Sequence, residues 1–150
     1  MSIGRIGTGI DLVNYFAAMP VQANCLNFLV TPVDVWEPGD KYDLITCVHG
    51  LHYVGDKLSV LKKAMRNLKD TGVFQANLDI KNIYIKDINP GKYLENIFSN
   101  NNIQYNSKTR IITCTGPRDI DFSIAYLGAN DQAGPNYTGQ EAVGSYYALH

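Results

Sequence analysis

The chain has 150 residues, 45% of them hydrophobic, and a formal net charge of −1 at pH 7. This size and composition fit one globular domain with a core of its own. The small net charge argues against a nucleic-acid-binding face, and no stretch has the length and hydropathy that would predict a membrane span or a signal peptide.

Three cysteines, Cys25, Cys47 and Cys114, lie far apart in the sequence. Their odd number and wide spacing match neither a zinc site nor a disulfide framework. Two of them stand in strand-like runs, where cysteine behaves as a small apolar residue. We therefore expect no metal site and a reducing, cytoplasmic environment.

The first predicted strand runs from Ile6 to Val13, with Asp11 near its C-terminal end. An acidic side chain there is placed to accept hydrogen bonds from both ribose hydroxyls of a nucleotide that lies across the edge of a sheet. The alternative, that Asp11 caps the next helix, stays open. A short helix at Asn14 to Ala23, limited by Pro20, and a strand at Leu26 to Val30 are expected to follow.

The strongest pattern in the chain extends from Tyr42 to Leu78. The apolar run Tyr42 to Val48 follows a turn and predicts a buried strand. Asp56 is a good N-cap for a helix that ends near Gly72, and Val73 to Leu78 predicts a second strand. The order strand, helix, strand predicts a crossover between two parallel strands.

The predicted helix has one apolar face, because its hydrophobic residues recur at spacings of three and four. The residues of this face are Leu58, Leu61, Met65 and Leu68. The basic residues are expected to lie largely off the face and to stay in water; they are Lys57, Lys62, Lys63, Arg66 and Lys69. We interpret them as a solvated surface and not as a nucleic-acid patch.

A loop with two histidines, His49 and His52, follows the strand at Tyr42 to Val48. It would lie at the carboxyl end of a parallel strand, where open α/β sheets bind their ligands. Either histidine could act as a base, since imidazole titrates near neutral pH. For His52 we favour packing and hydrogen bonding over catalysis. Two histidines without nearby cysteine or carboxylate ligands are too few for a metal site.

The C-terminal third predicts a helix at Pro90 to Asn100, with proline in its first turn, and then two strands. The strands, Ile103 to Thr115 and Ile120 to Leu127, flank a Gly-Pro turn and predict an antiparallel hairpin. The remaining segment, Gly128 to His150, is rich in glycine, asparagine and tyrosine, and we expect a tail of the single domain 1–150. Its tyrosines can dock onto other surfaces; they are Tyr137, Tyr146 and Tyr147.

Taken together, the run Tyr-Asp-Leu-Ile, the run His49-Gly-Leu-His-Tyr and a Leu-rich helix that ends Leu-Lys-Asp-Thr-Gly-Val-Phe resemble class I S-adenosylmethionine-dependent methyltransferases. The resemblance covers roughly Ile10 to Leu127, and the order and spacing of the motifs make it specific. It implies an α/β fold with a Rossmann-like, mostly parallel sheet flanked by helices, which ends in the antiparallel hairpin.

The resemblance also implies a set of residues around the cofactor S-adenosylmethionine. Asp11 and Leu12 match the positions that bind the ribose and the adenine, and Asp34 and Val35 match a second pair at the adenine, although Asp34 alone would also suit a turn. Val48 and His49 complete the cofactor side. The loop from His49 to Tyr53 would face a small-molecule methyl acceptor, which attacks the methyl group in line, and alignment supplies most of the rate.

One departure from the family concerns its first strand, glycine-rich loop and first helix, which have no counterpart before Asp11. Two functions therefore stay open: a methyltransferase, which the absent loop could leave inactive when alone, and a non-catalytic scaffold that serves as a binding or self-association module. A missing strand would leave unpaired backbone groups between the strands at Ile6 to Val13 and Tyr42 to Val48. We therefore expect a homodimer as the simplest way to fill the gap.

Overall fold

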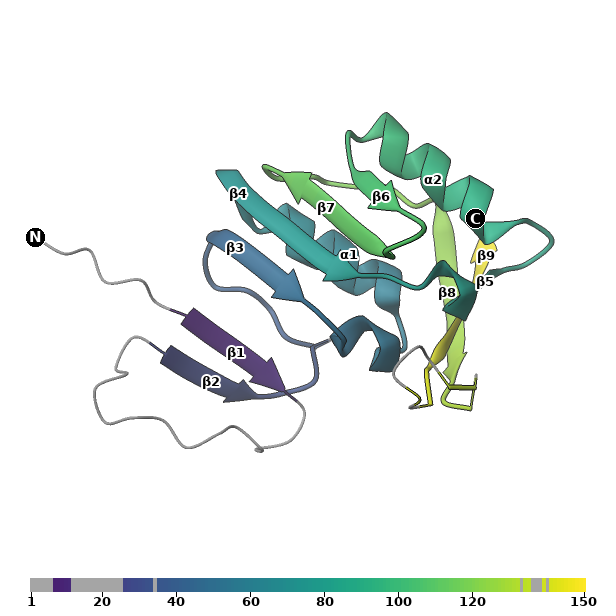
Figure 1. The fold of residues 1–150 in the computed structure, drawn as a ribbon, viewed down its shortest axis with the longest axis horizontal. Helices are drawn as coiled ribbons and strands as arrows, with labels where there is room; N and C mark the ends of the chain where they lie inside the picture. The colour runs from purple at the N-terminus through teal and green to yellow at the C-terminus, as the bar shows by residue number, and fades with distance from the viewer. Residues whose placement is uncertain (1–6, 12–25, 34, 133, 136–138, 140) are drawn as a thin grey trace, which may run out of the picture. The chain divides into compact units, whose positions relative to one another are not determined.

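The computed structural model describes residues 7–11, 26–33, 35–132, 134–135, 139 and 141–150. The chain divides into two compact units, Met1–Glu37 and Pro38–His150. Figure 1 labels the helices and strands of both units.

The first unit contains two parallel strands, β1 (Gly7–Asp11) and β2 (Leu26–Val30). They pair in regular register from Gly7 opposite Leu26 to Asp11 opposite Val30. The two strands predicted in this part of the sequence are thus confirmed where they are described, and Asp11 is the last residue of β1. The helix expected at Asn14 to Ala23 lies outside the described residues.

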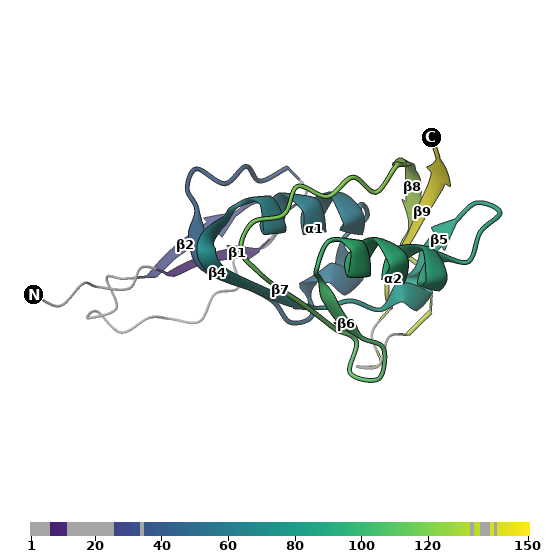
Figure 2. The ribbon, with the colours of Figure 1, turned by 90° about the horizontal axis from the view of Figure 1, so that it is seen from above.

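The second unit begins with the predicted crossover: β3 (Tyr42–Cys47), α1 (Lys57–Arg66) and β4 (Leu68–Asn77). Strands β3 and β4 are parallel neighbours, as the sequence predicts. The N-cap is also confirmed, because the Asp56 side chain accepts a hydrogen bond of 3.1 Å from the Ser59 amide. Figure 2 shows α1 on one side of the sheet that contains both strands.

Strand β4 begins directly after the helix, at Leu68, and not at Val73 as the sequence suggests. Its early part is irregular, because Leu68 pairs with Tyr42 whereas Val73 pairs with Leu44. Gly72 lies in this irregular stretch, where a Cβ atom would stand 2.5 Å from the Tyr42 carbonyl oxygen. Glycine is therefore required there by close backbone approach.

Two more strands complete a four-stranded sheet with the order β3-β4-β7-β6. Strand β7 (Ile111–Thr115) runs antiparallel to β4 on one side and to β6 (Gln104–Asn106) on the other. Helix α2 (Pro90–Asn100) precedes them and has the predicted bounds, with the Asn89 side chain as its N-cap. The buried residues Leu94 and Phe98 form its inner face.

A separate three-stranded sheet has the order β5-β9-β8. Its central strand, β9 (Gly144–Leu149), is parallel to β5 (Ile83–Ile85) and antiparallel to β8 (Ile124–Asn130). The segment after Gly128 thus contributes a strand with two neighbours. Within it Tyr147 is 2% exposed, so this tyrosine belongs to the core.

The prediction of a Rossmann-like, mostly parallel sheet flanked by helices, with its first strand and helix missing, is wrong. Among the described residues there are two α-helices, and the strands form three separate sheets with parallel and antiparallel pairs. Parallel pairing in the largest sheet stops at β4, because the next strand, β7, runs in the opposite direction.

The predicted terminal hairpin is wrong as well, because β7 and β8 lie in different sheets. Strand β7 already has a neighbour at each edge and leaves no position for β8. The alternating pattern at Ile120 to Leu127 also misled us in part. Ile120 and Phe122 are 0% and 6% exposed, but they belong to an extended connection that packs into the core before β8 begins.

The core lies on one face of the four-stranded sheet. Ile45, Phe74 and Cys114 are neighbours across three strands, and Phe74 and Cys114 are 2% and 3% exposed. The alternate positions point to the opposite face, as side chains do along a strand. There Thr46 and its neighbour Gln75 are exposed.

Candidate functional site

The carboxyl ends of β3 and β4 lie side by side, because the strands are parallel and Cys47 pairs with Ala76. The chain leaves β3 through His49 into the 3-10 helix η1 (Gly50–Tyr53). It leaves β4 through Asp79 into the 3-10 helix η2 (Ile80–Asn82). The carboxyl ends of these two strands therefore bring together two histidines and an aspartate, and this end of the sheet is the candidate site.

The two histidines of this edge differ in exposure. His49 is exposed, whereas His52 is 0% exposed, and their rings lie 6.4 Å apart between centroids. Burial lowers the pKa of His52, and the nearby charge of Asp79 opposes this effect. His52 is therefore a neutral imidazole at neutral pH, and His49 is the histidine that a solute can reach.

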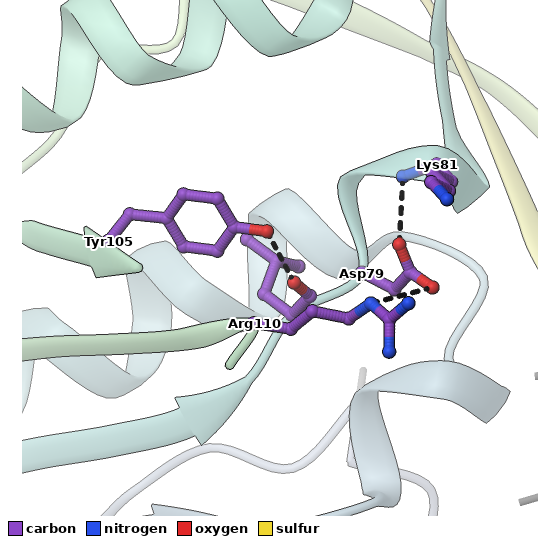
Figure 3. Close-up of polar contacts among 5 residues, drawn as sticks. Asp79, Lys81, Tyr105 and Arg110 are labelled. Carbon is purple, nitrogen blue, oxygen red and sulfur yellow. Dashed lines mark hydrogen bonds and ion pairs between the residues drawn. The ribbon is translucent and has the colours of Figure 1, made fainter. Parts of the chain in front are cut away.

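Asp79 is held by contacts from two directions, as Figure 3 shows. Its carboxylate accepts a hydrogen bond of 3.1 Å from the Lys81 amide and lies 3.5 Å from Nε of Arg110. The Asp79 side chain is 11% exposed and that of Arg110 33%. The pair is thus partly withdrawn from water, where charge interactions are stronger than at the open surface.

Tyr105 and the backbone around Leu78 fix the position of this ion pair. The Tyr105 hydroxyl donates a hydrogen bond of 2.9 Å to the Leu78 carbonyl, and the Leu78 amide donates one of 2.7 Å to the Arg110 carbonyl. Burial raises the pKa of Tyr105, and the negative charge of Asp79 raises it further. The phenol therefore keeps its proton and continues to donate at neutral pH.

The loop that carries the histidines is anchored by strand β9, through Lys57 at the start of α1. The Lys57 ammonium donates to the Val54 carbonyl at 2.8 Å, to the Val143 carbonyl and to the Ser145 hydroxyl at 3.0 Å. The prediction that Lys57 stays in water is therefore wrong: its exposed fraction is 1%. Burial lowers the pKa of Lys57 to about 8.

Further hydrogen bonds join β9 to the same turn. The Ser145 hydroxyl donates to the Gly55 carbonyl, and the Tyr147 hydroxyl donates to the Asp56 carboxylate at 3.0 Å. The Leu58 amide donates to the Tyr147 oxygen at 3.2 Å. Burial raises the pKa of Tyr147 far above its ordinary value. The first turn of α1 is thus held by residues from the other end of the chain.

The residues predicted at the cofactor divide between the two units. Asp11 ends β1, and Val35 is 64% exposed in the same unit. Leu12 and Asp34 lie outside the described residues. Val48, 59% exposed, and His49 belong to the second unit and stand with His52 at the carboxyl end of β3.

Sequence reasoning missed Asp79, Arg110 and Lys57 as members of the site or its support. Asp79 had a detectable signal, because it directly follows a predicted strand at the edge where α/β sheets bind ligands. Arg110 had none, since it reaches Asp79 only through the pairing of β4 with β7.

A hollow of about 160 Å³ lies elsewhere, at the opposite end of β7. Its lining residues are Asn102, Gln104, Thr113, Cys114, Thr115 and Arg118. Thr115 pairs with Val73, near the start of the regular part of β4, so this hollow is separate from the site at the strand's carboxyl end. Arg118 directs its guanidinium to backbone carbonyls, including that of Asn101 at 2.7 Å.

In the part of the chain that the structure describes, no three His, Cys, Asp or Glu side chains are grouped to hold a metal ion. The described helices also include none that is long and apolar enough to cross a membrane. The chain matches no protein-family model, no curated protein and no solved structure.

Proposed function

We propose that the chain is an S-adenosylmethionine-dependent methyltransferase with a small-molecule acceptor. The observation that carries this proposal is the parallel β3-α1-β4 crossover, which brings the His49 loop and Asp79 to one edge of a sheet. The three motifs that carry the sequence resemblance fall on the same segment, from Tyr42 to Phe74. A cytoplasmic location belongs to the proposal and fits the free thiols of Cys47 and Cys114.

The residues present suit a nucleoside cofactor in their chemistry. Val35 is exposed in the first unit, and exposed aliphatic surface is the kind of surface on which a flat base packs. Asp11 ends a parallel strand, where a carboxylate can accept from ribose hydroxyls. When bound, S-adenosylmethionine supplies an electrophilic methyl group.

At the acceptor side each residue has a different task. His49 is exposed and can accept a proton from an acceptor hydroxyl or amine at its imidazole nitrogen. His52 is buried and neutral, and its carbonyl accepts a hydrogen bond of 2.8 Å from the Val143 amide, which holds the loop in place. Asp79 and Arg110 offer one fixed charge of each sign, which can orient a polar acceptor before reaction.

The test is titration of the purified chain with S-adenosylmethionine and with S-adenosylhomocysteine in a calorimeter. We expect saturable binding, weakened in Asp11→Ala by about 1–3 kcal/mol, the scale of lost hydrogen bonds to a charged group. Asp40→Ala, which changes an exposed aspartate before β3, is the matched control and should bind as the wild type does. Absence of binding to both compounds would refute the proposal.

A second candidate is a non-catalytic role as a binding or self-association module. The observation that favours it is the position of β3 at the edge of its sheet. The two candidates are separable, because the calorimetric titration reports cofactor binding, whereas self-association is measured by mass.

A further inference from the structure

Strand β3 is the end strand of the four-stranded sheet. Of the strands that the structure describes, only β4 pairs with it, and the regular part of that pairing runs from Leu44 to Cys47. The side of an edge strand that faces away from its neighbour presents backbone amides and carbonyls to an incoming strand. Strand β3 thus has the geometry that accepts one more strand.

The side chains of this edge do not protect it. Natural edge strands commonly carry lysine, proline, a bulge or an inward-pointing charge that discourages pairing. Positions 44–48 read Leu-Ile-Thr-Cys-Val and contain no charge, proline or glycine. Leu44 and Val48 are 61% and 59% exposed, and Thr46 between them is exposed too.

We propose that β3 pairs antiparallel with β3 of a second copy, around a two-fold axis at Thr46. In this register pairing extends to Val48, the residue after the end of β3 at Cys47. Leu44 then lies opposite Val48 of the second copy, and the reverse pair repeats the contact. Thr46 lies opposite its own equivalent. Directly opposed residues of antiparallel strands share a face, so the two exposed aliphatic side chains cover each other.

A second copy is the fitting occupant because the segment complements itself. Antiparallel pairing brings no like charges together, since positions 44–48 carry none. The nearest charged residue is Asp43, whose carboxylate accepts a hydrogen bond of 2.8 Å from the Lys69 ammonium. The two Asp43 side chains lie at opposite ends of the paired strands, and each keeps its contact with Lys69 of its own copy.

The contact is small, because it involves one strand and its flanking side chains. Interfaces of this size are weak, and we therefore expect a dimer that forms as the concentration rises. Pairing would also bring the two His49 loops near the interface, since the loop begins just beyond the strand.

The first test is a charge exchange read by light scattering behind size-exclusion chromatography. The wild type should rise from 16.7 kDa toward twice this mass with concentration. Leu44→Lys with Val48→Lys places like charges opposite each other and should stay at the monomer mass. Leu44→Lys with Val48→Glu removes the same aliphatic surface but places opposite charges face to face, and should restore the dimer.

The second test is disulfide trapping, which does not depend on surface charge. In a background with Cys25→Ser and Cys47→Ser, Thr46→Cys should cross-link between copies, because the axis brings the two thiols together. Gln75→Cys, exposed on the same face but on the interior strand β4, is the control and should remain uncross-linked. A wild type of monomer mass at every concentration, equal masses for the two charge variants, or equal trapping of the two cysteines would each overturn the proposal.

Discussion

The Nζ atom of Lys57 lies 3.0 Å from the hydroxyl oxygen of Ser145, which is 88 residues later in the chain. This contact joins the first turn of α1 to strand β9, and two backbone carbonyls accept from the same ammonium. A buried cation with three oxygen partners is satisfied only while β9 is in place.

We predict that Lys57→Met lowers the free energy of unfolding by about 1–3 kcal/mol, because buried carbonyl oxygens lose their donor. Methionine keeps the length of the side chain, so packing is largely preserved. Lys62→Met is the control. The Lys62 side chain is partly exposed, and its ion pair with the exposed Asp119 carboxylate is long, at 3.9 Å, so it contributes little to stability. Urea unfolding should show a change of less than about 0.5 kcal/mol for the control.

The contribution of Lys57 to stability should depend on pH with a definite sign. Burial lowers its pKa from 10.5 to about 8 in the folded chain, so between these values the unfolded state binds more protons. Stability from this group therefore rises with pH through that window and is lost as pH falls through about 8. Below this window both states are protonated, and stability no longer changes with pH through this group.

The measurement is the stability of the wild type minus that of Lys57→Met, at pH 7 and at pH 9.5. The difference should grow by about 2 kcal/mol. The subtraction is needed because burial also raises the pKa of three acidic groups, those of Cys47, Cys114 and Tyr105. Their contribution to the free energy of unfolding falls as pH rises, because the unfolded chain loses these protons first. A difference that stays constant with pH would contradict a charged, buried Lys57.

The charges of Asp79 and Arg110 should move the pKa of His52 in opposite directions. Asp79 raises this pKa and Arg110 lowers it, against the larger lowering by burial. We expect Asp79→Asn to lower the pKa of His52 and Arg110→Gln to raise it. Titration by NMR, with the His52 signal assigned through His52→Gln, measures both shifts. Shifts of the same sign would show that the variants act through the loop conformation instead.

Two adjacent tyrosines of β9 provide a matched pair of variants. Tyr147→Phe removes the donor to Asp56 and the acceptor for the Leu58 amide, and should cost about 1–2 kcal/mol. Tyr146→Phe keeps the ring that stacks on Tyr84 at 4.8 Å and should change stability by less than about 0.5 kcal/mol. Thermal unfolding distinguishes the two, and an equal loss in both would argue against the buried hydroxyl as the cause.

The parts of the fold that follow from local signals were predicted well. Helix α2 begins at Pro90 after an asparagine cap and has the expected end, because capping and proline chemistry act within one turn. The parallel pairing of β3 with β4 was also predicted, since a helix between two apolar runs allows few other arrangements.

The errors concern partners that are distant in the sequence. Nothing near β7 indicates that β4 and β6 occupy both its edges, and so the hairpin with β8 was wrong. The pattern around Lys57 predicts a solvated lysine, whereas contacts with Val143 and Ser145, distant in the sequence, bury it. At the candidate site, His49 and His52 were predicted from the sequence. Arg110 was not, because its contact with Asp79 arises only when β7 pairs with β4.

Strand β9 also bears on how the chain can fold during synthesis. The turn before α1 leaves the ribosome long before Val143, Ser145 and Tyr147, which form hydrogen bonds with Asp56 and Lys57. The His49 loop is therefore expected to remain loosely held on the nascent chain and to become ordered only when β9 inserts between β5 and β8. Completion of the candidate site is thus timed to the emergence of its last strand, and a chain cut before Val143 would display the loop without fixing it.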